Sequence, residues 1–136
     1  MAIAKTVVGL EALVLLGLGM VGFVSPQTVM GMTGIEAHNA VAISEARVIF
    51  GALHFIIGGF FAGVALGVTR TSVEQALGLL VLLFGGMGIG RAVVVLIDDS
   101  WSLFHGGGLV FDFFLAALAM WARQWVVGSV RTGSDG

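Results

Sequence analysis

The sequence predicts an all-α integral membrane protein, a four-helix bundle that crosses the bilayer up, down, up and down with both termini in the cytoplasm. The chain of 136 residues is 58% hydrophobic and only 10% charged, whereas soluble domains carry roughly a quarter charged residues. Its apolar runs are each about as long as the 20 residues that a helix needs to cross a bilayer. They lack the alternation of a barrel strand. We expect residues 1–136 to form a single transmembrane domain.

The first helix is predicted over residues 2–24. It should end at Ser25-Pro26, because proline has no backbone N–H and disfavours helix at the residue before it. A cleaved signal peptide is the competing interpretation of this run. Glu11 argues against it, because a charged residue would then lie in the apolar region of the signal, and no small-x-small cleavage site follows.

Three further helices are predicted over residues 45–68, 76–97 and 107–127. A short polar link separates the second from the third, so these two should be antiparallel neighbours. Residues 25–44 are too polar to span and are expected to lie along the membrane surface as a connection. Residues 128–136 form a small polar tail that we expect to be disordered.

Basic residues give the orientation. One side of the predicted membrane carries Lys5, Arg70, Arg123 and Arg131, while the opposite connections hold no lysine or arginine beyond Arg47. The positive-inside rule therefore places both termini in the cytoplasm.

Glycine is abundant, with 22 residues, and recurs every four positions in two helices, as Gly59, Gly63 and Gly67 and as Gly86 and Gly90. Such spacing makes a smooth stripe that another helix can approach closely. We interpret both stripes as helix-packing surfaces. The alternative is that they leave space for a bound lipid or a flat cofactor.

Charged residues inside the predicted spans are the main candidates for a site. From the outer ends of their helices, Arg91 should lie about 9 Å deep, Asp112 about 7 Å and Arg47 about 3 Å. An unpaired charge in the membrane is costly. We therefore predict an ion pair between Arg91 and Asp112, with Glu45 or Asp112 available to Arg47. This polar cluster is either structural, fixing which helices are neighbours, or the lining of an outward cavity whose guanidiniums bind a carboxylate or phosphate. We favour the structural interpretation.

His54 and Glu11 lie deeper. His54 should be close to the bilayer centre, about 13 Å below the outer end of its helix, where it hydrogen-bonds across helices or, as the alternative, ligates a haem or chlorophyll. Glu11 is expected about 20 Å from the outer end of the first helix and to be protonated if unpaired, because burial disfavours the charged form. A proton relay through His54 and Glu11 is disfavoured, since few ionisable groups lie between them to carry a proton.

The segment Ser44-Glu45-Ala46-Arg47-Val48-Ile49-Phe50-Gly51 resembles the Glu-x-Arg-x-x-(Tyr)-Gly-Gly signature of the DUF4345 family of small bacterial four-helix membrane proteins. Pro26, the run from Gly88 to Arg91, and Asp112 match further landmarks of that family. Phe50 and Ala52 depart from it, standing where tyrosine and a second glycine are common, and Asp112 stands where glutamate is expected. The resemblance implies a fold, a polar cluster and a bacterial inner membrane, but no activity.

Three functions remain open at this level. An accessory or scaffold protein, packing against itself or in a larger membrane complex, is favoured by the glycine stripes and short loops. An outward-facing binding or transport module would hold a lipid head group or small anionic solute at Arg47, Arg91 and Asp112. A membrane enzyme would use His54 or Glu11, but the chain contains no recognisable catalytic or metal-binding motif. Beyond the bilayer we expect no cofactor and no metal. We also expect no nucleic acid, since the net charge is only −2.

Overall fold

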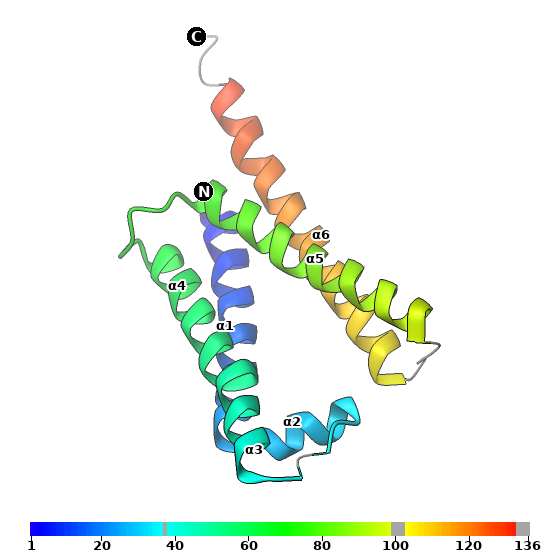
Figure 1. Cartoon of the computed structure of the whole chain (residues 1–136). Coiled ribbons are helices and arrows are strands. Elements are labelled where there is room, and N and C mark those ends of the chain that lie inside the picture. Colours follow the sequence, from blue (N-terminus) through cyan, green and yellow to red (C-terminus); the bar gives the residue numbers. More distant parts are fainter. Residues whose placement is uncertain (37, 99–102, 133–136) are drawn as a thin grey trace. The chain divides into compact units, whose positions relative to one another are not determined.

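The computed structural model describes residues 1–36, 38–98 and 103–132, and each regular element in these ranges is a helix (Figure 1). The elements are α1 (Ala2–Val24), α2 (Pro26–Thr33), α3 (Ala40–Ala46), the π-helix η1 (Arg47–Leu53), α4 (His54–Leu66), α5 (Val73–Asp98) and α6 (Leu103–Thr132). Because α3, η1 and α4 follow one another without a break, they form one long helix. The predicted all-α class is confirmed.

Four stretches are long and apolar enough to cross a membrane, namely Ala2–Val24, Ala40–Leu66, Val73–Ile97 and Leu103–Gly128. Each overlaps one of the predicted helices. Large apolar side chains are exposed on all four, among them Leu13, Ile56, Leu82 and Val110. A water-soluble protein rarely exposes so much contiguous apolar surface.

Two helices begin earlier than predicted because their capping residues were overlooked. The α5 helix starts at Val73 instead of 76, where the Gln75 backbone N–H donates to Ser72 Oγ at 3.2 Å and the Ser72 N–H donates to Gln75 Oε1 at 3.1 Å. This reciprocal arrangement is a capping box. The second long helix starts at Ala40 instead of 45, with Asn39 Oδ1 accepting from the Ala42 N–H.

The connection predicted over residues 25–44 is therefore largely helical. Pro26 opens α2, as its missing N–H costs nothing in the first turn of a helix. Gly34 ends α2 with a left-handed φ of 74°, and Gly67 ends α4 one residue after Leu66 with a φ of 75°. Both glycines adopt a backbone conformation that other residues reach only at a cost.

The last helix is also longer than predicted, from Leu103 to Thr132 instead of 107–127. The expectation of a disordered tail from residue 128 was wrong for residues 128–132. That expectation rested on polarity, but polarity alone does not end a helix, and Gly128 remains helical. Residues 133–136 lie outside the described ranges.

The chain forms two compact units, one of residues 9–69 and the other of residues 1–8 and 70–136. Within residues 9–69, α1 packs closely against η1 and α4 through glycines. A Cβ atom added to Gly51 would lie 2.7 Å from Phe23 Cα, and one added to Gly58 would lie 2.8 Å from the Leu16 backbone N. These helices can approach only because both positions lack a side chain.

In the other unit, α5 and α6 form an antiparallel hairpin (Figure 1). Residue numbers rise along α5 as those of the contacting residues on α6 fall: Gly78 lies near Arg123, Gly85 near Ala116 and Gly88 near Phe113. Apart from Asp112, the buried side chains of these two helices are small or apolar, among them Ala76, Leu77, Leu80, Phe84, Leu115, Ala119, Ala122 and Val126.

The predicted glycine stripes are not the surfaces that the helices of each unit use for packing. Among the described residues, no atom would lie within 4 Å of a Cβ added to Gly59, Gly86 or Gly90, and Gly67 serves as a helix cap. Gly63 faces Thr69, not another helix. Glycine spacing marks a face that a helix can approach, but it does not decide which face is used.

Candidate polar site

The predicted ion pair between Arg91 on α5 and Asp112 on α6 is present. Arg91 Nε donates to Asp112 Oδ2 at 3.1 Å. The Asp112 side chain is 5% exposed and that of Arg91 22% exposed, so both charges are largely removed from the surface. In such surroundings each charge depends on the other for neutralisation.

One face of α6 is built around the Arg91 guanidinium. Phe104, Gly108 and Asp112 follow at intervals of four residues, which places them on the same side of a helix. The Phe104 ring centroid lies 5.8 Å from Arg91 Cζ, within cation–π range. A Cβ atom added to Gly108 would lie 2.8 Å from the same Cζ, so glycine there leaves the space that the guanidinium occupies.

Arg47 has a different kind of partner. Its Nε donates at 2.9 Å to the backbone carbonyl of Phe23, in the last turn of α1. Carbonyls at a helix end lack intrahelical donors and carry the negative end of the helix dipole, so a guanidinium there is favourable. Of the two carboxylates expected to be available to Arg47, Asp112 is bound by Arg91 and Glu45 is exposed, and among the described residues neither forms an ion pair with Arg47.

The Glu-x-Arg signature begins in the last two residues of α3, and from Arg47 onward it lies in the π-helix η1. Arg47 is its first residue, and Gly51, at the close contact with α1, lies within it. A π-helix holds one extra residue per turn, is rare, and is found most often at functional sites. Here it joins the arginine that caps α1 and the glycine on which α1 packs.

An apolar pocket of about 330 Å³ opens between α1 and the η1–α4 helix. It is lined by Met20, Phe23, Ala52, Phe55 and Ile56. Phe23 belongs both to this pocket and to the Arg47 hydrogen bond. Sequence reasoning missed the pocket, because its lining is indistinguishable in composition from the rest of the apolar helices.

His54 follows η1 directly, and its Nδ1 lies 3.1 Å from the Ile49 carbonyl oxygen. Since a carbonyl can only accept, this contact requires the proton on Nδ1 and leaves Nε2 as the nitrogen that could bind a metal centre. A hydrogen bond within its own helix thus replaces the cross-helix bond that we expected. The haem or chlorophyll alternative stays a prediction.

Glu11 lies in the apolar middle of α1 and is 1% exposed. Neither of its carboxyl oxygens has a hydrogen-bond partner among the described residues. A carboxylate would be very costly in such a position, so the group is expected to be neutral. Among the described residues, no group of three or more histidine or acidic side chains could hold a metal ion.

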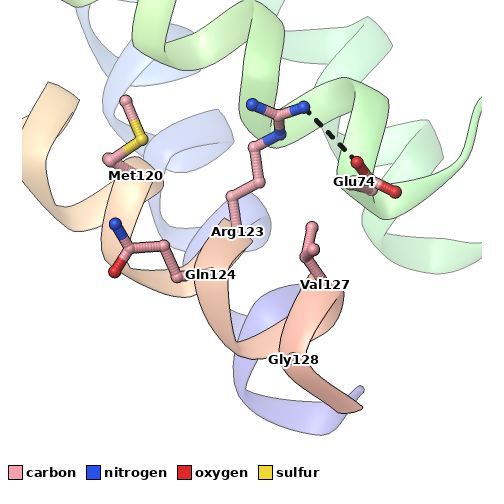
Figure 2. Close-up of a pocket in the computed structure, with 6 residues that line it drawn as sticks. All are labelled: Glu74, Met120, Arg123, Gln124, Val127 and Gly128. Atoms are coloured by element: carbon pink, nitrogen blue, oxygen red, sulfur yellow. Dashed lines mark hydrogen bonds and ion pairs between the residues drawn. The ribbon is translucent and has the colours of Figure 1, made fainter. Parts of the chain in front are cut away.

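A second ion pair was overlooked from the sequence. Arg123 Nη2 on α6 lies 3.4 Å from Glu74 Oε1 in the first turn of α5 (Figure 2). A pocket of about 450 Å³ beside it is lined by these two residues together with Met120, Gln124, Val127 and Gly128. Both side chains are more than 40% exposed, so this pair contributes little to stability. The hairpin could have indicated it, because the start of one antiparallel helix meets the end of the other.

The predicted site residues thus divide between the two units. Arg91 and Asp112 pair within the α5–α6 unit, while Glu11, Glu45, Arg47 and His54 belong to residues 9–69. Arg91 is neutralised by a carboxylate, whereas Arg47 donates a hydrogen bond to a backbone carbonyl.

A model of the family described as "Domain of unknown function (DUF4345)" matches residues 3–123, which is most of the chain. No curated protein and no solved structure matches this chain.

Proposed function

Because the chain belongs to the DUF4345 family, whose function is unknown, we propose its role from its own residues: an accessory or scaffold protein that crosses a bacterial inner membrane four times. Both termini lie in the cytoplasm, and the helices run up, down, up and down. Helix α2 lies along the outer surface of the membrane. Four apolar stretches of sufficient length support this placement.

The observation that carries the accessory role is the closed pair between Arg91 and Asp112. A substrate site in the membrane keeps charges available, whereas here the carboxylate is 5% exposed and already bound by Arg91. The pair therefore acts as a polar link that fixes α5 against α6. Phe104 places its ring near the Arg91 guanidinium, and Gly108 leaves the space that this guanidinium occupies. Both contacts support a structural role for the pair.

Uncovered small residues support contact with other helices. Gly86 and Gly90 lie on one face of α5, and no atom of their unit approaches that face closely. Leu82, 72% exposed, continues it one turn earlier. In lipid, such a face gives a second helix close van der Waals contact.

The proposal is tested by releasing the tagged protein from its membrane in mild detergent and recording its assembly mass by native mass spectrometry. We expect the protein to form a larger assembly, either with itself or with other subunits. This assembly should be lost in the double variant Gly86→Leu with Gly90→Leu. Val110→Phe is the control, since Val110 is 70% exposed and lies on α6 instead of α5. A lone chain at every protein concentration would contradict the accessory role.

A binding module is the second candidate, and Arg47 favours it. Its guanidinium has no carboxylate partner among the described residues, so one positive charge of the 9–69 unit remains available to an anion.

A further inference from the structure

Arg47 and the apolar pocket beside Phe23 share a residue, and from this juxtaposition we propose that they bind one anionic phospholipid. The lipid phosphate lies on the Arg47 guanidinium, and an acyl chain occupies the pocket lined by Met20, Phe23, Ala52, Phe55 and Ile56. This inference rests on the proposed membrane insertion and deepens the second candidate function.

The first step is the hydrogen-bonding capacity of Arg47. A guanidinium has five N–H donors and no acceptor. Within the described part of the chain Nε alone is used, on the Phe23 carbonyl at 2.9 Å. That bond fixes the plane of the side chain and leaves both Nη groups to donate, the geometry that binds two phosphate oxygens at once. The charge is half-buried and not neutralised by a carboxylate among the described residues.

The second step is the pocket. Its lining has no polar side chain, and its volume of about 330 Å³ is open to the surface between two apolar helices. Met20 and Phe23 are three residues apart on α1, while Ala52, Phe55 and Ile56 follow the same spacing on η1 and α4. Such spacing puts the residues of each helix on one face, so the pocket is lined by an apolar face of α1 and an apolar face of the η1–α4 helix, against which an acyl chain can pack.

The third step joins the two. Phe23 is the last but one residue of α1, and its carbonyl binds Arg47 while the same residue lines the pocket. From Arg47 to Ile56 the chain rises by no more than about 14 Å. The Arg47 charge thus lies beside the last turn of α1, which the proposed topology puts on the head-group side of the outer leaflet, and the apolar pocket continues from it along α1 and α4.

A free anion would use only the arginine, and a partner helix only the pocket. An anionic phospholipid uses both, and charge complementarity with Arg47 selects it over a zwitterionic one.

The test is native mass spectrometry of the whole protein in detergent, titrated with phosphatidylglycerol or with phosphatidylcholine of the same acyl chains. We expect one phosphatidylglycerol to be retained about tenfold more tightly than phosphatidylcholine, since contacts to a charged group dominate the difference. Arg47→Gln should abolish this preference. Ala52→Phe, which fills the pocket, should weaken retention of both lipids.

Matched controls separate these effects from general ones. Arg70→Gln removes the same charge at an exposed position, and Leu66→Phe adds a ring at a position that is 78% exposed on α4. Neither should change lipid retention. If Arg47→Gln does not fold, the lipid preference of the unaltered protein and the Ala52→Phe variant still decide the matter.

Equal retention of the two lipids would overturn the proposal. So would a phosphatidylglycerol preference that survives in Arg47→Gln, or displacement by inorganic phosphate with no effect of Ala52→Phe, which would indicate a soluble anion. Alkaline carbonate extraction reports separately on insertion. A protein that stays in the membrane but shows no lipid preference contradicts the lipid site alone, whereas an extracted protein contradicts the proposed membrane function.

Discussion

At Arg91, a charge inside an apolar hairpin is accommodated by three residues of one helix face. Asp112 supplies the opposite charge, Phe104 an aromatic ring, and Gly108 the space between them. Arg47 shows the other solution, since its partner is the end of a helix backbone. The Arg91 charge is neutralised by Asp112, whereas the Arg47 charge is not neutralised by its carbonyl partner.

Removing Asp112 tests whether the pair is structural. In Asp112→Ala, Arg91 keeps its charge in a largely buried position, and the expected loss is about 3 kcal/mol of unfolding free energy. Replacing both residues, as in Arg91→Leu with Asp112→Leu, should recover most of it because no unpaired charge remains. Titration with a denaturing detergent measures each variant. A double variant as unstable as the sum of the single ones would argue against a direct pair.

Gly108 and Gly107 provide a second residue-level test. Alanine at position 108 would force the Arg91 guanidinium to move, whereas no atom of the unit would lie within 4 Å of a Cβ at position 107. We expect Gly108→Ala to lower the midpoint of thermal unfolding and Gly107→Ala to leave it unchanged or raise it, since alanine favours helix. Equal effects would show that Arg91 does not occupy this space.

At the scale of elements, α1 and the η1–α4 helix meet where side chains are missing. A Cβ at Gly51 would meet the Phe23 backbone at 2.7 Å, and backbone cannot give way as a flexible side chain can. The π-helical turn places this glycine and Arg47 so that one contacts the end of α1 and the other caps it.

Gly51→Ala should therefore destabilise the 9–69 unit by about 2 kcal/mol, as expected for overpacking. Gly59→Ala is its control on the same long helix, at a position with open space, and should be neutral or stabilising. Thermal unfolding followed by circular dichroism in detergent measures both. A neutral Gly51→Ala would mean that the helices do not cross here.

At the scale of the whole molecule, four membrane-spanning stretches would place both ends of the chain on the same side of the membrane. Reporter fusions at residue 136 and in the link at Thr71 should both be active on the cytoplasmic side, and a fusion near residue 37 on the opposite side. Lys5, Arg70 and Arg123 lie on the predicted inner side, as the positive-inside rule requires. A C-terminal reporter active outside the cytoplasm would contradict four spans with both termini inside.

The α5 capping box could have been predicted, because Ser72 and Gln75 have the required spacing. The same holds for Asn39 at the start of α3 and for the Phe104, Gly108 and Asp112 spacing. The Arg91 to Asp112 pair was predicted correctly, since depth and opposite charge restrict the choice of partner. Arg47 was not, because a backbone carbonyl leaves no mark in the sequence.

The sequence by itself determined the helical class, the four apolar stretches and the family, because these depend on composition and on position along a helix. Only the tertiary structure decided which glycines are covered, where the pocket opens and which atom Arg47 binds. The physical reason is that helices apolar on every side carry no stripe marking an inner face. Their rotation is then set by close packing, at positions such as Gly51 and Gly108, which only the folded chain brings against their partners.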